Sequence, residues 1–227
     1  MLIQGTIVNV AAVISGSIIG LIIHNKLPER IIKTVFQGIG LFTLFLGFSM
    51  ALKTNNILLM VFSLVLGAIT GELLKLEARI EFLGDKVKSK IRTKNDKFTE
   101  GLVTAFMLFC MGSMTILGAI EEGMGGVSDL LLTKSLMDGF ASIALASSLG
   151  LGVLFSVVPL MIYQGGLTLF AGLLEGMFTE LMINEISAVG GIILIGLGIN
   201  ILEIKKLKIL NLVPSLLFIA VLVYYIK

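Results

Sequence analysis

Charged side chains are scarce in this sequence. Only 14% of its 227 residues are Asp, Glu, Lys or Arg, whereas 56% are hydrophobic and the mean hydropathy is +1.05. Soluble domains carry about one quarter charged residues. The charges here stand in short islands between long uncharged runs, a pattern typical of membrane-spanning helices. The composition excludes an ordinary soluble protein and predicts one integral membrane domain of the all-α class over residues 1–227.

Cysteine, histidine and the common catalytic motifs are also scarce or absent. The one cysteine, Cys110, excludes an intrachain disulfide framework, and its place in an apolar run is typical of a packed thiol. The one histidine, His24, has no other metal ligand near it in the sequence. No phosphate-binding loop, zinc spacing, nucleophile elbow or dinucleotide fingerprint occurs. We therefore expect no cofactor, no metal site and no enzymatic activity.

Eight hydrophobic segments are long enough, or nearly so, to cross a bilayer. They lie at about 2–23, 35–52, 57–72 and 101–120, at two places within 139–174, and at 186–202 and 207–226. The first lacks a basic leader and a polar stop, so we interpret it as a permanent span rather than a signal peptide.

The uncharged run 139–174 is too long for one crossing. A single helix of that length would measure about 54 Å, whereas the hydrocarbon core is about 30 Å thick. Two short crossings with a turn near 156–159 fit better and bring the total to eight spans. One crossing followed by a re-entrant segment is the alternative.

The distribution of basic residues predicts the topology. Most of the 17 Lys and Arg residues lie in 24–33, 75–97 and 203–208, and the intervening loops are acidic. Because basic loops face the cytoplasm, the eight-span interpretation places these three segments inside and both chain ends outside. Segment 75–97 has one aromatic residue, Phe82, so we expect it to bind anionic lipid headgroups rather than nucleic acid.

The two ends of the chain share a pattern of small and polar residues at a nearly constant offset. The matched positions are Gly38, Gly40, Gly47 and Ser49 near the start and Gly190, Gly191, Gly198 and Asn200 near the end. In the eight-span interpretation the two halves run in opposite directions, as do the inverted repeats of secondary transporters. We divide the chain into a first repeat (1–74), a basic linker (75–99), central spans (100–157) and a second repeat (158–227). Chance similarity and a one-helix direct repeat are the alternatives.

Small residues also recur four positions apart within single spans. They are Ala12, Gly16 and Gly20, and Gly67 with Gly71. Such spacing lets helix backbones approach closely. We expect packing within the chain, and a homo-oligomer interface is the alternative.

Within these boundaries no acidic or basic side chain lies in the middle of a span, which argues against a carboxylate-based proton pump or a voltage sensor. The candidate pathway residues for a solute or ion are Asn9, Ser49, Gly112, Ser113, Thr115, Asp138, Ser142, Pro159, Tyr163, Gln164, Gly165 and Asn200. Pro159, followed by Gly165 and Gly166, is the most suggestive feature because it can unwind a helix at membrane depth. Ordinary helix packing is the alternative for each residue.

Several motifs resemble those of a known family. They are Gly5-Thr6-Ile7-Val8-Asn9, the GSIIGLII run of the first span, Met111-Gly112-Ser113-Met114-Thr115-Ile116, Asp138-Gly139 and Tyr163-Gln164-Gly165. These are similar to a bacterial inner-membrane family catalogued as domain of unknown function 554. The resemblance implies a multi-span protein of the bacterial cytoplasmic membrane and no particular substrate. We expect a transporter or channel for a small solute or ion, and the alternative is a non-catalytic membrane scaffold or accessory subunit.

Overall fold

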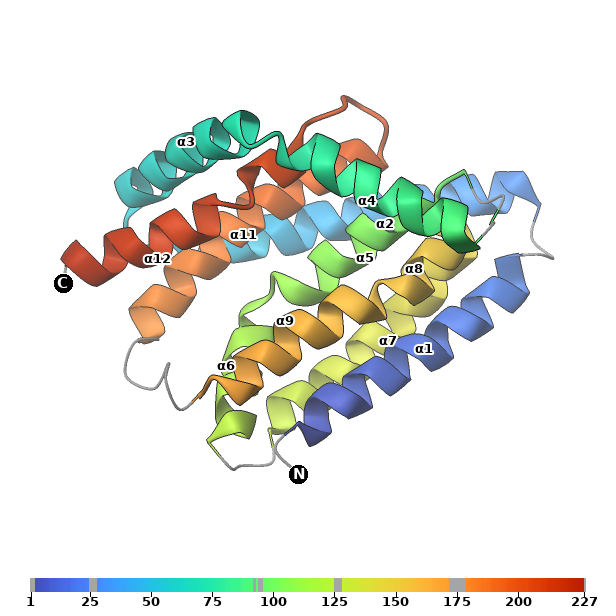
Figure 1. Ribbon diagram of the computed structural model, residues 1–227, viewed down its shortest axis with the longest axis horizontal. Helices are drawn as coiled ribbons and strands as arrows, with labels where there is room; N and C mark the ends of the chain where they lie inside the picture. Colours follow the sequence, from blue (N-terminus) through green and yellow to red (C-terminus); the bar gives the residue numbers. More distant parts are fainter. Residues whose placement is uncertain are drawn as a thin grey trace. The chain divides into compact units, whose positions relative to one another are not determined.

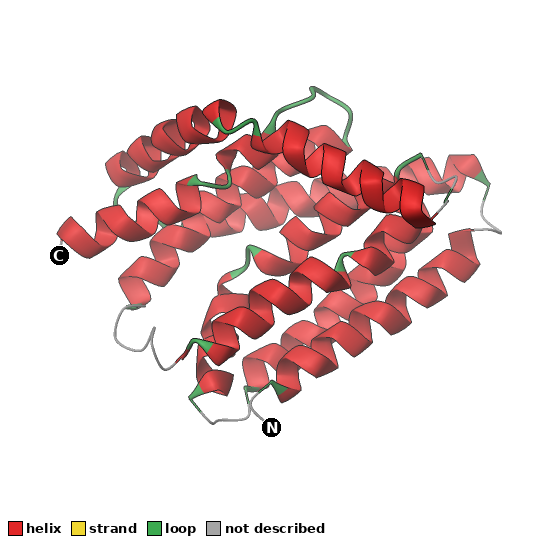
Figure 2. Ribbon diagram, in the orientation of Figure 1, coloured by secondary structure: helices red, strands yellow, loops and turns green. Residues whose placement is uncertain are grey.

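The computed structural model describes residues 3–24, 28–91, 93, 96–124, 128–171 and 179–226. These residues form helices and loops with no strand, so the all-α prediction is confirmed for them (Figure 2). The α-helices, labelled in Figure 1, are α1 (Gln4–His24), α2 (Glu29–Ala51), α3 (Ile57–Leu73), α4 (Leu76–Ile91), α5 (Phe98–Cys110), α6 (Ser113–Gly123), α7 (Asp129–Leu149), α8 (Leu151–Phe155), α9 (Val157–Leu169), α11 (Glu180–Ile201) and α12 (Ser215–Ile226). A 3-10 helix, η1 (Ile209–Leu212), precedes α12.

Among the described residues, five helical segments are long and apolar enough to cross a membrane. They are α1, α2, α7, the pair α8–α9, and α11. Two further pairs, α3–α4 bent by 55° and α5–α6 bent by 64°, raise the number to seven if each pair is one span. The region of η1 and α12 is apolar but shorter. A multi-span helical membrane fold is therefore supported, and the number of eight spans stays a prediction.

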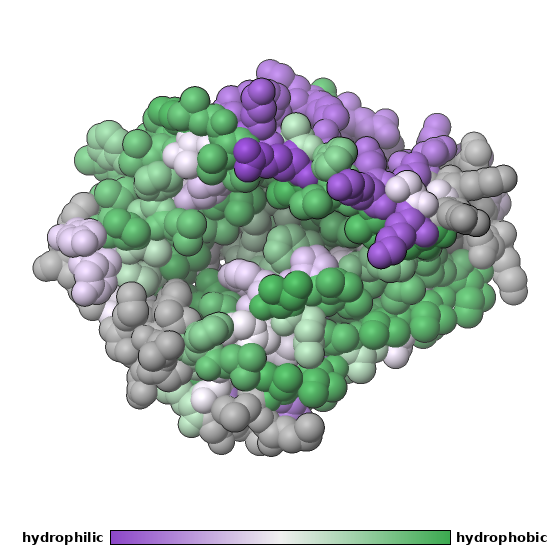
Figure 3. Space-filling view, in the orientation of Figure 1, coloured by the Kyte–Doolittle hydropathy of each residue, from purple (hydrophilic) through white to green (hydrophobic). Residues whose placement is uncertain are grey.

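Helix α1 shows how the sequence suits a lipid environment. Its buried face is made of small and polar residues, including Gly5, Thr6, Asn9, Gly16 and Gly20. Its exposed face is largely isoleucine, including Ile18, Ile19 and Ile22. A helix on the surface of a soluble protein has the opposite arrangement. On the face shown in Figure 3, hydrophobic side chains likewise cover α3 and α12, and hydrophilic side chains gather along α4.

The helices group into two compact units. Unit 1 comprises Met1–Ile39, Lys88–Cys110 and Met114–Glu175, and unit 2 comprises Gly40–Val87, Met111–Ser113 and Gly176–Lys227. The two units do not coincide with the predicted repeats, because α1 and α3 belong to different units although both lie in the first predicted repeat. The inverted repeat therefore stays a prediction.

In unit 1, α1 lies directly against α7. A Cβ atom added to Gly16 would lie 2.2 Å from the carbonyl oxygen of Gly139, and one added to Gly20 would lie 2.5 Å from that of Ile143. Only glycine leaves room for so close an approach. The prediction that these small residues serve helix packing within the chain is confirmed at Gly16 and Gly20.

This contact gives a first testable prediction. Replacing Gly16 with Ala forces the two helices apart, and overpacking of this kind costs about 1–3 kcal/mol of unfolding free energy. The matched control is Gly166→Ala on α9, because an added Cβ there meets nothing within 4 Å. Unfolding in detergent, followed by helical circular dichroism, should show a lower midpoint for Gly16→Ala alone. Equal midpoints for the two variants would contradict the close approach.

The turn within 139–174 lies at Gly150, so the predicted position near 156–159 is wrong. Helix α7 ends at Leu149, and Gly150 adopts φ 76° and ψ −146°, a conformation that glycine reaches at little cost. The chain stays helical around Ser156, whose φ is −63° and ψ −16°, and Leu151–Leu169 forms one 19-residue candidate span. Pro159 lies in the first turn of α9, where a proline removes no helical hydrogen bond.

Unit 2 is also held together by glycine contacts. A Cβ added to Gly67 would lie 2.1 Å from Ser215 Oγ at the start of α12, and one added to Gly71 would lie 2.0 Å from the Asn211 carbonyl oxygen in η1. Helix α3 therefore packs closely on η1 and α12, which confirms helix packing at these two glycines as well.

Candidate functional site

Ionisable side chains are buried between the helices of unit 1, whereas the sequence predicts no charged side chain in the middle of a span. Helix α7 begins at Asp129 rather than near 139, so Lys134 and Asp138 both belong to this candidate span. Their side chains are only 7% and 10% exposed. Glu122 on α6 is 4% exposed. Asp138 lies near the middle of this candidate span, so the prediction of no charge in mid-span is wrong at that residue.

Lys134 and Asp138 form an ion pair one helical turn apart on α7. The Lys134 ammonium donates to Asp138 Oδ2 and lies 6.0 Å from the centroid of the Phe109 ring on α5. The spacing of four residues brings both side chains to one face of the helix.

Two amide side chains continue the network from Asp138. Asn9 Nδ2 donates to Asp138 Oδ2 and to Gln164 Oε1, at 3.0 Å in each case. Gln164 Nε2 in turn donates to Thr6 Oγ1 over 3.3 Å. Asn9, Gln164 and Thr6 are completely buried. Helices α1 and α9 thus contribute amides that connect the ion pair to the first turn of α1.

Glu122 ends the network at the N-terminus of α1. Its carboxylate accepts hydrogen bonds from the backbone N–H groups of Gly5 and Thr6, from Thr6 Oγ1 at 3.2 Å and from Thr168 Oγ1 at 3.3 Å. The first amides of a helix have no partner within the helix, and they carry a partial positive charge. A carboxylate placed there is stabilised by both effects.

These contacts form one continuous set of hydrogen bonds across four helices. We define the buried polar network as Lys134, Asp138, Asn9, Gln164, Thr6, Thr168 and Glu122. It contains two carboxylates and one ammonium. Among the residues that the structure describes, Asn9 Oδ1 is a buried acceptor with no hydrogen-bond partner.

The helix break that the sequence suggested at Pro159 to Gly166 is instead between α5 and α6. Gly165 and Gly166 are helical, whereas Met111 and Gly112 separate two helices that are bent by 64°. Thr115 Oγ1 donates to the carbonyl oxygen of Phe109 over 2.9 Å and so satisfies a backbone acceptor beside the break. The break therefore follows directly after the residues of α5 that face the ion pair.

The network brings together three of the predicted residues, Asn9, Asp138 and Gln164. Gly165 lies beside Thr6, since an added Cβ would be 3.8 Å from its methyl group. Four further members were not predicted to be functional, namely Lys134, Glu122, Thr6 and Thr168.

Other predicted residues in unit 1 have separate roles. Ser142 donates to the Gly139 carbonyl oxygen over 2.7 Å, within the contact between α1 and α7. The Tyr163 ring meets the Phe106 ring edge-on at 6.3 Å.

The remaining predicted residues belong to unit 2. Ser49 on α2 is exposed. Asn200 Nδ2 donates to the Leu207 carbonyl oxygen and Asn200 Oδ1 accepts from the Leu207 N–H, at 2.9 and 2.7 Å, so it holds the loop after α11. Gly112 lies at the break, and the Ser113 side chain is outside the described residues.

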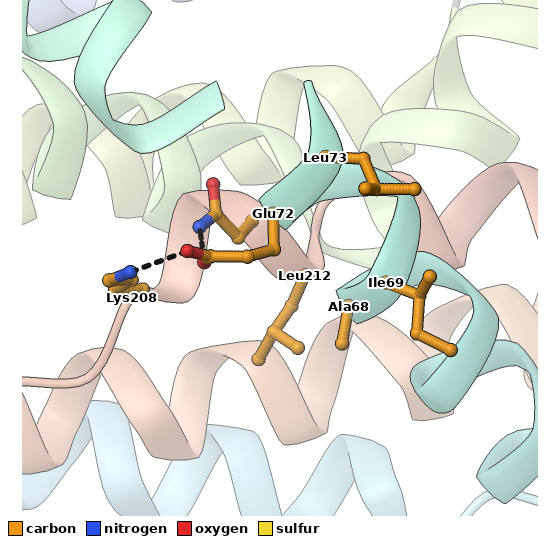
Figure 4. Close-up of a pocket in the computed structure, with 7 residues that line it drawn as sticks. Ala68, Ile69, Glu72, Leu73, Lys208 and Leu212 are labelled. Carbon is orange, nitrogen blue, oxygen red and sulfur yellow. Dashed lines mark hydrogen bonds and ion pairs between the residues drawn. The ribbon is translucent and has the colours of Figure 1, made fainter. Parts of the chain in front are cut away.

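Unit 2 has an open pocket of about 500 Å³ at the end of α3. Its lining is mostly apolar and includes Asn211, and Glu72 and Lys208 lie at one side (Figure 4). The Glu72 carboxylate accepts from Lys208 Nζ and from Asn211 Nδ2, each at 2.7 Å. The hydrogen bond that Lys208 donates to this carboxylate raises the pKa of Lys208. Both carboxylate oxygens are therefore occupied by groups of the protein itself.

Helices of this length and composition, enclosing a buried ion pair, define a polytopic helical membrane protein. Residues 4–224 match the family described as protein of unknown function DUF554, and the chain belongs to this family.

Two relatives are similar over almost their whole length. The Uncharacterized membrane protein YdfK of Bacillus subtilis (strain 168) is 37% identical over 226 residues, covering 98% of this chain and 96% of that protein. The Uncharacterized protein YqgA of Escherichia coli (strain K12) is 34% identical over 218 residues, covering 94% and 93%. No solved structure matches the chain.

Proposed function

We propose that the protein is a non-enzymatic transporter or channel for a small solute or ion in the bacterial cytoplasmic membrane, and that the buried polar network lines its pathway. One observation carries this proposal. An ion pair and a second carboxylate are buried between helices whose outer surfaces are largely apolar, and hydrogen bonds join the three charged groups.

The energetic cost of these groups supports a functional role. A charged side chain at the centre of a membrane helix costs about 2.5–3.5 kcal/mol on insertion scales. Apolar residues of similar size could fill the same space without that cost. Ionisable groups inside membrane helices are characteristic of ion and substrate pathways for this reason.

The backbone break between α5 and α6 supports the same proposal. Transporters commonly form binding sites where a membrane helix is interrupted, because the helix ends then offer free backbone groups. Here the break begins two residues after Phe109, whose ring centroid lies 6.0 Å from the Lys134 ammonium.

The topology belongs to the same proposal. The basic segments would face the cytoplasm and both chain ends would lie outside, following the positive-inside rule. Helix α4 carries Lys88 and Lys90 in its last turn and would lie against anionic headgroups. Its hydrophilic surface in Figure 3 is suited to that position.

Flux in proteoliposomes tests the proposal. Wild-type protein and Gln164→Ala are compared against a panel of radiolabelled ions and metabolites, with Gln37→Ala as the matched control because Gln37 is an exposed residue of α2. The Gln164 side chain makes two hydrogen bonds to neutral side chains, and such bonds contribute about 0.5–1.5 kcal/mol each. Losing both should lower the flux of the identified species about tenfold.

The result also separates transport from the scaffold alternative. Wild-type flux in Gln164→Ala would show that the network is not the pathway. No flux of any species, together with a stoichiometric partner that co-purifies, would replace transport by the role of a scaffold or accessory subunit.

A further inference from the structure

The ammonium group of Lys134 occupies a place with the properties of a cation site. It contacts the Asp138 carboxylate and lies 6.0 Å from the face of the Phe109 ring. Carboxylates and aromatic faces both attract cations, and the attraction is stronger where water is excluded. Both members of the ion pair are at least nine-tenths buried. The cation in this place is tethered by a long and flexible side chain.

Asn9 supplies the second and independent observation. Its Nδ2 atom donates to Asp138 Oδ2 at 3.0 Å, and Oδ1 belongs to the same planar amide, so this oxygen lies in the neighbourhood of the carboxylate without a bond to the Lys134 ammonium. Asn9 is completely buried, yet Oδ1 has no partner among the described residues. Unpaired buried acceptors are rare and call for an explanation. A bound cation would provide one, because amide oxygens are good ligands for hard cations.

We propose that Asp138, Asn9 and Phe109 form a binding site for a small monovalent cation, an alkali-metal ion or a small ammonium ion, and that the Lys134 ammonium fills this site when the ion is absent. The proposal deepens the transport function and rests on it, since the cation would be the transported or coupling species. The ion binds to the Asp138 carboxylate as the Lys134 ammonium leaves it. One positive charge replaces another, so the carboxylate is never left uncompensated in a medium of low dielectric constant.

The charges of the network favour a monovalent ion over a divalent one. Glu122 already accepts four hydrogen bonds at the start of α1, so Asp138 is the carboxylate that an ion can compete for. One carboxylate balances a single positive charge. Calcium and magnesium require about six or more oxygen ligands and usually more than one carboxylate.

The position of Lys134 allows the exchange. It lies near the N-terminal end of α7, which begins at Asp129. Lysine side chains placed near helix ends can extend toward the membrane surface while their stems stay in apolar surroundings. The displaced ammonium can therefore move toward water without a change in the helix.

Removing the tethered cation gives the decisive experiment. In purified Lys134→Met, thermal unfolding in detergent is measured in sodium, potassium, ammonium or methylammonium chloride. N-methyl-D-glucamine chloride keeps the ionic strength constant. We expect saturable stabilisation by at least one small cation, with a half-saturating concentration at least about tenfold lower than in wild type, because the internal competitor no longer occupies the site. Lys134→Gln, which keeps a neutral polar side chain, serves if Lys134→Met does not fold.

Two controls assign the effect to Asp138. The double variant Lys134→Met with Asp138→Asn should show no cation-specific stabilisation. In Lys134→Met the half-saturating concentration should rise as the pH falls, because a proton competes with the cation for the same carboxylate. The side chains that bond to this carboxylate are Lys134 on its own helix and Asn9 on α1. Phe109 on α5, which Cys110 follows in the sequence, lies against the Lys134 ammonium.

Three outcomes would overturn the site. These are a Lys134→Met variant that responds to cations no more than wild type, a double variant that responds equally well, or an affinity that does not change with pH. The test measures binding without transport, so it can be separated from the proposed function. Cation binding without flux of any species would refute transport and keep the site, whereas flux without cation binding would refute the site alone.

Discussion

Replacing Asp138 with Asn is expected to lower the free energy of unfolding by about 3–5 kcal/mol, the usual cost of leaving one partner of a buried ion pair alone. The Lys134 ammonium would then have to stay among neutral groups or give up its buried place, and either change costs stability. Asp96→Asn is the matched control, because Asp96 pairs with Lys88 at 3.5 Å but its side chain is 100% exposed. An exposed pair of that kind contributes about 0–1 kcal/mol. Unfolding by sodium dodecyl sulfate, followed by circular dichroism, measures both variants.

The double variant Lys134→Met with Asp138→Asn completes this prediction. Removing both charges eliminates the uncompensated ammonium, so most of the lost stability should return even though the ion pair is gone. If the loss of unfolding free energy in the double variant equals the sum of the losses in the two single variants, the two side chains do not interact. A cost for Asp138→Asn as small as that for Asp96→Asn would show that the pair is not buried.

The sequence alone predicts the helical segments well, because hydrophobic length is a local property. The predicted first and third spans, 2–23 and 57–72, agree with α1 and α3 to within a few residues. The error at α7 has a clear cause. Charged residues usually mark the ends of membrane spans, and this rule places Lys134 and Asp138 before the start of the span. Their spacing of four residues was the signal that both could share one buried face of a helix.

The buried polar network was harder to predict than the helices. Asn9, Asp138 and Gln164 were each suspected from their chemistry, but their proximity depends on how α1, α7 and α9 pack. Gly16 and Gly20 suggested a close helix contact for α1 without naming α7 as the partner. Thr6, Thr168 and Glu122 were missed because their role appears only when a glutamate from α6 reaches the first turn of α1.

The position of the turn after α7 shows a similar limit. Proline and glycine both interrupt helices, and the sequence offers Gly150 and Pro159 within one uncharged run. Proline is tolerated in the first turn of a helix, where its missing N–H has no partner to lose. Gly150 instead adopts a positive φ, which reverses the chain direction at low cost. The choice between them depends on packing that the local sequence does not record.

The second large effect is expected at Glu122, whose carboxylate holds the start of α1. Replacing Glu122 with Ala leaves the buried backbone N–H groups of Gly5 and Thr6 without an acceptor. Each buried donor left unpaired costs about 1–3 kcal/mol, so we expect a loss of about 2–6 kcal/mol in unfolding free energy. The Thr168 hydroxyl would lose less, because it also reaches the Gln164 carbonyl oxygen at 3.1 Å.

The neighbouring glutamate provides the control for this effect. Glu121 is exposed and accepts a hydrogen bond from Ser128 Oγ at 2.9 Å, so Glu121→Ala should cost about 1 kcal/mol or less. Hydrogen exchange adds a local measurement, since the Gly5 and Thr6 amides should exchange faster in Glu122→Ala and at the wild-type rate in Glu121→Ala. Equal stability losses for both variants, or unchanged exchange at these two amides, would mean that Glu122 does not hold the N-terminus of α1. Thr6 connects Glu122 to Gln164, so this result would also contradict the hydrogen bonds that join Glu122 to the ion pair on α7.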